Sequence, residues 1–493
     1  MTEIPTRTVA ADAPADYSVL RWLVGATFIV ILNETIMVNA IPRLMVEFDV
    51  TARSAQWLST AFMLTMAVVI PVTGWFLQRV TTRQAFALAM TVFAAGTLIA
   101  ALAPAFWVLL LARIVQASGT AVMMPLLMTT LMSVVPERDR GRVMGNVTLA
   151  MSVAPALGPA VSGVILEFFS WRWIFGFVLP LAIIVAVAGL SRLRNVGEPT
   201  AGSVDVASVM LSAFGFGSMV YGLSLIGDQH AAVPPSVLIG GGLAVIGLFV
   251  WRQLALQRGR SPLLDLRTLT HRTFTLSLLL MSVAFMGFLG AMILLPLYLQ
   301  DARGLTTLQT GLLLIPGGLA MGLLGPRVGK TFDQFGGRPL VIPGSVGIVI
   351  GLALFARIDL HTPYLAVLGI HVLLMVSLAA VFTPVFTLGL GDVPPELYSH
   401  ASSLLGALQQ VAGAVGTAIS VTILSSRQGH LLGEGVSAAG AFVGGMQRAF
   451  WVSAALAVIV VAIAAVLPGR VAGSGGNGTD AGMEPEPESV PAL

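Results

Sequence analysis

The chain has no cysteine and few charged residues. None of its 493 residues is cysteine, which excludes disulfides, cysteine-based zinc clusters and thiol chemistry. Charged residues make up only 10% of the chain, against about 25% in soluble domains, while 56% of the residues are hydrophobic. The surface of a water-soluble protein needs more charged residues than this chain has. Most of the surface of this protein must therefore face lipid.

The chain also lacks the marks of a secreted or nucleic-acid-binding protein. Residues 1–17 are polar and show no short apolar core followed by a cleavage site, so we expect no removable signal peptide. The net charge of +3 does not indicate a nucleic-acid partner, because basic residues gathered on one face of a membrane give the same total.

Long apolar runs are what the chain has in abundance. A helix crosses the ~30 Å hydrocarbon layer in about 20 residues. Fourteen runs of about that length occur, at 20–41, 54–77, 84–103, 106–133, 143–166, 172–190, 205–226, 234–254, 273–297, 308–328, 340–357, 363–389, 400–424 and 447–467. The sequence therefore predicts an all-α integral membrane protein with 14 transmembrane helices.

Basic residues are unevenly shared between the segments that connect these runs. With the N-terminus inside, 18 Lys and Arg fall in the segments predicted to be cytoplasmic and seven in the outer ones. This asymmetry obeys the positive-inside rule. It predicts a multi-pass protein of the cell (plasma or inner) membrane with both termini in the cytoplasm.

Two pairs of segments repeat at a nearly constant offset. "GWFLQRVTTR" (74–83) is similar to "GKTFDQFGGR" (329–338), and residues 135–165 align without gaps to 393–423. A chance match of small residues would not easily keep the flanking loops in register as well. Duplicated halves around a central site are typical of secondary transporters. The spacing predicts two six-helix bundles with two extra helices between them.

Domain boundaries follow from the runs and the repeat. The tail is rich in Gly, Ser, Pro and Glu, so we expect it to be disordered. The predicted parts are a cytoplasmic N-terminal segment (1–19), an N-terminal six-helix bundle (20–190), a cytoplasmic linker (191–204), two additional helices (205–254), a cytoplasmic loop (255–272), a C-terminal six-helix bundle (273–467) and a disordered cytoplasmic tail (468–493).

Three ionisable residues lie at the predicted hydrocarbon depth: Glu34, Arg113 and His371. A charge there costs at least ~2.5–3.5 kcal/mol, which is tolerated when the group faces a wet cavity or a partner. Glu34 is the main candidate, because a buried carboxyl can load and release a proton, or meet a cationic solute. Each residue also has a structural alternative. Neighbouring groups could hydrogen-bond Glu34 and fix its helix, and Arg113 could cap the carbonyls of a broken helix. His371 has no acidic partner in its apolar run, which favours a role in helix packing.

Several motifs resemble one known family. "LNETIMVNAIP" (32–42) is similar to the first-helix motif of the major facilitator superfamily, in its fourteen-helix drug:proton antiporter branch. "RIVQASGTA" (113–121) resembles the fourth-helix motif and "APALGPAVSG" (154–163) the antiporter signature of the fifth helix. Segments 74–83 and 329–338 resemble the family's cytoplasmic Gly–Asp–Gly–Arg loop. The resemblance covers roughly residues 20–467.

The resemblance implies that Glu34 and Arg113 couple proton movement to transport. Many members of the branch carry Asp at the position of Asn33, whereas here the acid lies one residue later, about 100° around a helix. Gln78 stands where the first loop of the family has Asp, and the second loop keeps its acid as Asp333.

The glycines and prolines of the same motifs predict a conformational gate. Pro kinks a helix, and small faces let helices approach and slide, although a statically kinked packing helix is the alternative. The predicted gate residues are Gly74, Arg83, Pro155, Gly158, Pro159, Gly163, Asp333, Gly336 and Arg338.

Met, aromatic and amide side chains predict the wall of a binding cavity. Met packs adaptably and aromatic faces attract cations, while ordinary packing is the alternative at each position. The predicted substrate contacts are Asn33, Trp57, Phe62, Gln116, Met123, Asn146, Tyr221, Phe288, Met292, Phe382, Gln409 and Gln410, with Met124 and Phe386 beside them.

We therefore predict a proton-coupled exporter of hydrophobic, often cationic, small molecules such as drugs, which works by alternating access and confers antibiotic resistance. We expect a monomer whose partners are substrate, protons and lipids, with no cofactor or metal. The same fold exporting a siderophore, lipid, peptide or self-made antibiotic is the nearest alternative. A receptor or scaffold is another, and an enzyme is a third that no clustered acids or metal-spaced ligands support.

Overall fold

The computed structural model describes residues 18–196, 199–200, 202–226, 232–258 and 262–470. Within these ranges it contains helices and no strand, and 14 helices are long and apolar enough to cross a membrane. The prediction of an all-α protein with 14 spans is confirmed. Almost all of the expected tail and of the expected N-terminal segment lies outside the described residues.

The spanning helices follow one another with short connections. They are α1 (Ser18–Ile36), α3 (Ala52–Leu77), α4 (Thr82–Ala101), α5 (Phe106–Val134), α6 (Arg140–Phe168), α7 (Arg172–Arg192), α8 (Val206–Ser224), α9 (Pro235–Leu256), α10 (Arg272–Leu297), α11 (Thr307–Phe335), α12 (Arg338–Phe355), α13 (Tyr364–Gly391), α14 (Tyr398–Gly433) and α15 (Ala438–Val466). Shorter elements are η1 (Met37–Ala40), α2 (Ile41–Glu47), η2 (Glu137–Asp139), η3 (Leu266–Thr270), η4 (Tyr298–Ala302) and η5 (Pro395–Leu397).

The helix ends correct several predicted boundaries. The first run was predicted to reach residue 41, but α1 ends at Ile36 and passes through the 3-10 turn η1 into α2. Pro42, at the start of α2, supplies no N–H for the preceding turn, which favours this break. Helices α14 and α15 extend well beyond the apolar runs at 400–424 and 447–467, because hydropathy marks the hydrocarbon depth rather than the length of a helix.

The two repeated segments predicted as loops are mostly helical. Residues 74–77 continue α3 and residues 329–335 continue α11. Only 78–81 and 336–337 connect helices in these places. Gly336 ends α11 with a φ of +81°, a conformation that favours glycine.

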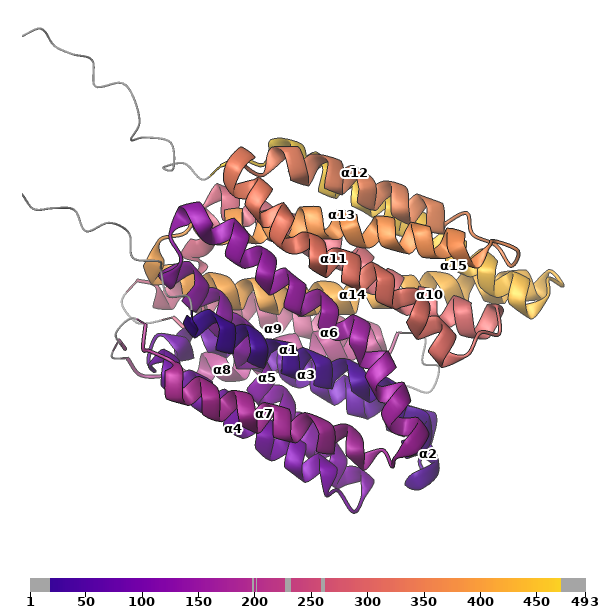
Figure 1. Cartoon of the computed structure of the whole chain (residues 1–493), viewed down its shortest axis with the longest axis horizontal. Helices are drawn as coiled ribbons and strands as arrows, with labels where there is room; N and C mark the ends of the chain where they lie inside the picture. Colours follow the sequence, from indigo (N-terminus) through magenta and orange to yellow (C-terminus); the bar gives the residue numbers. More distant parts are fainter. Residues whose placement is uncertain (1–17, 197–198, 201, 227–231, 259–261, 471–493) are drawn as a thin grey trace, which may run out of the picture.

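Both described ends of the chain lie on one side of the helix bundle, as an even number of spans requires (Figure 1). We call this side the terminal face. In Figure 1 the purple helices α1 and α3–α7 form one bundle and the orange-to-yellow helices α10–α15 form the other. Helices α8 and α9 pack on each other, and α8 also contacts α3 and α14.

The two bundles meet chiefly through two pairs of helices, α6 with α11 and α3 with α14. The first pair is close because glycines face each other across it. A Cβ on Gly145 would run into the backbone of Gly325, and one on Gly329 into the carbonyl of Gly141. Helices pack this closely only where side chains are absent.

Hydrogen bonds between the bundles cluster in the half next to the terminal face. The hydroxyls of Thr73 and Ser403 are 2.8 Å apart, as are those of Thr148 and Thr383. Along their whole lengths, α1 packs mainly against α5, α6 and α7, and α10 packs mainly against α13, α14 and α15, all within their own bundles. The structure is therefore closed at the terminal face.

Candidate functional site

The two charged residues singled out from the sequence lie on neighbouring helices. Glu34 is half-buried in the last turn of α1, just before the helix gives way to η1. Arg113, on α5, is buried, with an exposed fraction of 1%. Each charge acts electrostatically on the other. The structure thus brings together the predicted proton-coupling pair, while the role of the pair stays a prediction.

The guanidinium of Arg113 donates its hydrogen bonds to groups other than the carboxylate of Glu34. It donates to the carbonyl of Leu58 at 3.3 Å and to the side-chain oxygen of Gln116 at 3.1 Å. Its central carbon lies 4.1 Å from the ring centroid of Phe62, an arrangement in which the ring face attracts the cation. Helix α3 is continuous at Leu58, so Arg113 does not cap a broken helix there.

Gln116 extends this polar chain to α4, where its amide donates to the hydroxyl of Thr97 at 2.9 Å. The contact is short because Gly96 faces α5, and a Cβ there would come within 2.8 Å of the Gln116 side chain. Thr97 was missed from the sequence, since one threonine in an apolar run gives no functional signal. Gln116 accepts a hydrogen bond from Arg113 in this structure, and its predicted contact with substrate stays a prediction.

Glu34 receives no hydrogen bond from the described residues, and its neighbour Asn33 is more isolated still. Asn33 is fully buried, and neither its amide nitrogen nor its oxygen has a partner within the described chain. A fully buried side chain cannot touch solute in this state. Thr27 lies two turns before Glu34 on the same face, and its hydroxyl is likewise buried without a partner among the residues described.

Aromatic side chains from α10 and α13 form a second group. The ring centroids of Phe288 and Phe382 lie 6.3 Å apart, and Phe285 joins both at 5.7 and 6.3 Å. Met292 is half-buried one turn further along α10. The sequence analysis named all of these residues except Phe285. Phe285 lies three residues before Phe288, and this spacing places both rings on the same face of α10.

The other predicted substrate contacts do not join this group. Trp57 and Tyr221 face each other with centroids 5.3 Å apart, at the contact of α3 with α8. Phe62 and Met123 are buried in helix packing. Of the remainder, Gln409, Gln410 and Met124 are half-buried, Phe386 is buried and Asn146 is exposed. Their contact with substrate stays a prediction.

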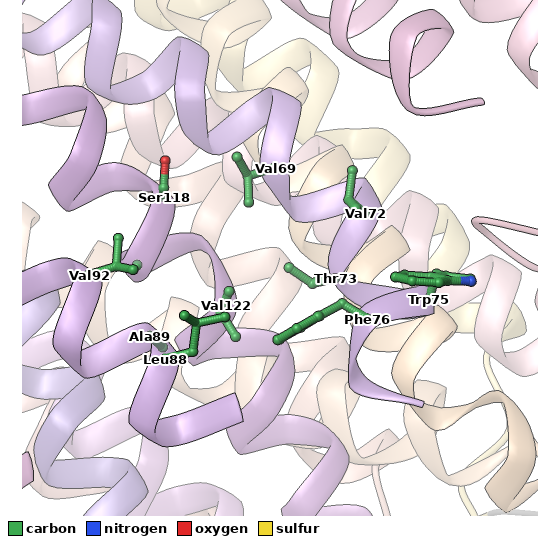
Figure 2. Close-up of a pocket in the computed structure, with 11 residues that line it drawn as sticks. Val69, Val72, Thr73, Trp75, Phe76, Leu88, Ala89, Val92, Ser118 and Val122 are labelled. Carbon is green, nitrogen blue, oxygen red and sulfur yellow. The ribbon is translucent and has the colours of Figure 1, made fainter. Parts of the chain in front are cut away.

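A pocket of about 260 Å³ lies between α3, α4 and α5, and Figure 2 shows its lining. Its walls are almost wholly apolar and include Trp75, Phe76 and Val122. None of the predicted proton-coupling or substrate residues lines it. Leu88 on its rim is 51% exposed, which on a spanning helix indicates contact with lipid.

The predicted gate residues divide by their surroundings. Asp333 accepts hydrogen bonds from the backbone N–H groups of Gly141 and Arg142, both at 2.8 Å, at the N-terminus of α6. A negative charge is stabilised there by the helix dipole. Gly158 packs closely against Thr35, next to Glu34.

Of the other predicted gate residues, Gly74 packs on His400 across the two bundles, and Gly336 ends α11. Arg338 donates to the carbonyl of Leu467 at 3.2 Å within its own bundle, and the side chain of Arg83 is exposed. A Cβ on Gly163 would meet nothing within 4 Å. Pro155 lies within α6, as does Pro159, whose side chain is outside the description. Their part in a gate stays a prediction.

Two histidines are buried in the seams between helices. His371, on α13, lies 3.3 Å from the carbonyl of Leu314 and packs on Gly317 of α11, which agrees with a packing role. His400, on α14, faces Gly74 of α3 across the two bundles. His400 was not singled out from the sequence, because it lies at the edge of an apolar run.

Comparisons with known families, sequences and structures find relatives of one kind, membrane transporters and drug-resistance proteins. The chain matches the family description Major Facilitator Superfamily over residues 23–417. It is 40% identical over 82% of its length to lincomycin resistance protein LmrB of Listeria innocua, covering 85% of that protein. It is 30% identical over 84% of its length to putative multidrug resistance protein MdtD of Klebsiella pneumoniae, covering 87% of it. The crystal structure of the human organic anion transporter MFSD10 superposes with a TM-score of 0.68 at 14% identity, covering 92% of this chain and 100% of that one, which shows the shared fold.

Proposed function

This chain belongs to the major facilitator superfamily of transporters, and from that premise we propose that it is a proton-coupled antiporter that exports hydrophobic, often cationic, small molecules. It is a multi-pass membrane protein with relatives named for multidrug resistance. The name of its 40% identical relative makes lincomycin the first candidate substrate.

One observation carries the proposal of proton coupling. Glu34 is a half-buried carboxylate within a spanning helix, and no hydrogen bond from the described residues holds it. Arg113 balances its charge from α5 while donating its hydrogen bonds to Leu58 and Gln116. A carboxyl not locked into a direct ion pair can gain and lose a proton as its surroundings change.

The closed terminal face supports alternating access. We assign this face to the cytoplasm, because the segments on its side carry most of the Lys and Arg residues. In the state described here a proton enters from the outside and binds Glu34, and solute leaves. Opening of the seams between α6 and α11 and between α3 and α14 then exposes Glu34 to the cytoplasm, where the proton departs and solute binds.

The aromatic group on α10 and α13 supports the substrate class. The three rings of Phe285, Phe288 and Phe382 present faces that attract organic cations and edges that pack on apolar groups. The adaptable side chain of Met292 lies beside them. Such a surface suits varied hydrophobic solutes better than a sugar or an amino acid.

Purified protein in liposomes tests the proposal. An imposed proton gradient should drive lincomycin or a hydrophobic dye cation against its concentration gradient, and collapse of the gradient by a protonophore should stop it. Lincomycin transport that ignores the proton gradient would contradict the coupling. Gradient-driven transport of neither probe, with transport of a peptide or siderophore instead, would contradict the substrate class.

Asp333→Asn should weaken closure of the cytoplasmic side. An amide offers one acceptor where the carboxylate offers two to Gly141 and Arg142, and it loses the charge that the helix dipole stabilises. Interactions of this kind are worth roughly 0.5–2 kcal/mol, so we expect transport to fall by about 2- to 30-fold. Asp359→Asn, an exposed site on the opposite face, should leave the transport rate unchanged. An unchanged rate in Asp333→Asn would exclude the acid from the gate.

A further inference from the structure

The two additional helices carry a polar network at the terminal face. Asp205 caps α8 by accepting from the N–H of Ser208, and it binds the guanidinium of Arg252 on α9 through two hydrogen bonds of 2.7 and 2.8 Å. The hydrogen bond from Arg252 holds the pKa of Asp205 well below its usual range. The Gln253 amide donates to the Ser208 hydroxyl at 2.7 Å. Helices α8 and α9 are thereby tied together where they leave the membrane.

The same network fixes the segment that follows α9. The side-chain oxygen of Gln253 accepts the backbone N–H groups of Leu263 and Leu264 at 2.8 and 3.2 Å. The amide of Gln257 donates to a carboxylate oxygen of Asp265 at 3.0 Å. Gln253 is fully buried and Asp265 is 3% exposed. The extra helices therefore hold residues 262–270 in a fixed position.

Asp265 is held as an anion there. Burial raises the pKa of the Asp265 carboxyl, but hydrogen bonds from the side chain and backbone of Arg267 outweigh it and hold the pKa below the usual value. The nearest nitrogen of Arg267 lies 2.6 Å from the carboxylate. The segment thus presents a buried negative charge, partly balanced by Arg267.

That charge acts electrostatically on His400, which lies in the first turn of α14. His400 is 3% exposed, and its ring lies against the backbone of Leu263. The charged groups that act on the ring are Asp265 on the fixed segment, Arg267 on η3 and Arg79 after the end of α3. One anion and two cations therefore surround a buried imidazole.

The ring also closes the seam between the bundles. Its Nδ1 atom lies 3.0 Å from the place where a side chain on Gly74 of α3 would begin, and it has no hydrogen-bond partner within the described chain. Next to it, Thr73 and Ser403 form one of the hydrogen bonds that join the bundles. A neutral imidazole tolerates a bare Nδ1, whereas an imidazolium needs an acceptor for a second N–H. No described residue of the closed seam accepts a hydrogen bond from Nδ1.

We propose that His400 and Asp265 form a second proton-binding site, which takes up a proton only when α3 and α14 separate, and that α8 and α9 serve to hold this site in place. This proposal rests on the proposed function, because it assumes that the cytoplasmic side opens and closes during transport. Each closure of that side would then release a proton from His400.

The expected dependence on pH has a definite sign. An open seam lets water reach the imidazole of His400, and an imidazole in water has an unperturbed pKa of about 6.5. With the seam closed it stays neutral, so closure below that pH first requires loss of a proton. The ratio of open to closed molecules should rise by up to about tenfold for each pH unit below 6.5, and should not depend on His400 above about pH 7.5.

The cysteine-free sequence makes this measurable. Ser133→Cys on α5 and Lys330→Cys on α11 place two spin labels at exposed sites near the terminal face, one on each bundle. We expect the distance distribution, measured in liposomes by pulsed electron resonance, to gain a longer component as pH falls from 8 to 5.5. His400→Gln, which keeps a polar side chain that does not protonate in this range, should remove most of this change.

Two further variants keep the inference testable if His400→Gln folds poorly. Asp265→Asn removes the anion that favours protonation, and should move the midpoint of opening to lower pH by about one unit. Gln253→Leu frees residues 262–270 and should broaden the transition without abolishing it. The same midpoint in the parent, His400→Gln and Asp265→Asn would overturn the proposal.

Failure of this inference and failure of the proposed function give different results. If His400→Gln keeps both the pH-dependent opening and gradient-driven export, the second site is wrong and the antiporter stands. If the parent opens with pH through His400 but exports nothing when a gradient is imposed, the antiporter is wrong and the proton site stands.

Discussion

Glu34→Gln should abolish accumulation of substrate driven by a proton gradient. A proton entering down 100 mV supplies ~2.3 kcal/mol, which is enough for a concentration ratio of about 50-fold for an uncharged solute at one proton per solute. An amide does not carry a proton in the working range, so the ratio should fall to one while passive exchange of solute across the membrane persists. Reconstituted protein with an imposed potential and pH gradient gives both quantities.

The matched control is Glu167→Gln, which removes an exposed carboxylate on α6 and should keep the full ratio. A second test moves the acid. Asn33→Asp combined with Glu34→Gln restores a carboxylate at the position that many relatives of the drug:proton antiporter branch use. Asn33 is fully buried, whereas Glu34 is half-buried, so we expect no rescue. Coupled transport in the single Glu34→Gln variant would remove Glu34 from the mechanism, and rescue by the double variant would show that position 33 becomes accessible.

Gly145→Val should have the second large effect, on closure of the cytoplasmic side. A side chain at this position would run into the backbone of Gly325 on α11, which cannot move without parting the bundles. Overpacking costs about 1–3 kcal/mol, which corresponds to a shift of roughly 5- to 150-fold toward molecules open to the cytoplasm. Transport should fall at least tenfold, and the label pair at positions 133 and 330 should report a longer distance at all pH values.

Gly163→Val is the control on the same helix. A Cβ on Gly163 meets nothing within 4 Å in this closed state, so this variant should keep the parent's distance between the labels at positions 133 and 330. The two substitutions add the same side chain to α6 and differ only in what faces it. Equal label distances in the two variants would contradict the assignment of the α6–α11 contact as the seam that opens and closes.

Several features were predictable from residues near each other in sequence. Each of the 14 spans follows from a run of apolar residues long enough to cross lipid, and all 14 are present. Glu34 and Arg113 stood out because a charge in such a run is costly wherever the helix lies. Asp333 was indicated by its motif, and the structure gives it partners at the start of α6.

Other features needed the packed helices. The cavity wall predicted from Met and aromatic residues separates into an aromatic group on α10 and α13, a contact between Trp57 and Tyr221, and core packing at Phe62. Composition does not tell which face of a hydrophobic helix meets lipid and which meets protein, because both are apolar. Gly163 and Gly145 look alike in one motif-rich helix, yet only Gly145 meets another backbone.

The sequence alone determined the number of spans and the cost of a carboxylate at position 34, since each depends on the transfer of one segment from water to lipid. It also indicated the duplicated plan, because segments of the two halves resemble each other. The tertiary structure decided that Arg113 donates its hydrogen bonds to Leu58 and Gln116, and that the glycines of α6 and α11 join the bundles at the terminal face. It also decided that His400 packs on Gly74 of α3, where the charge of Asp265 acts on it. These contacts join residues far apart in the chain, and a pattern confined to one helix does not specify which partner will face it.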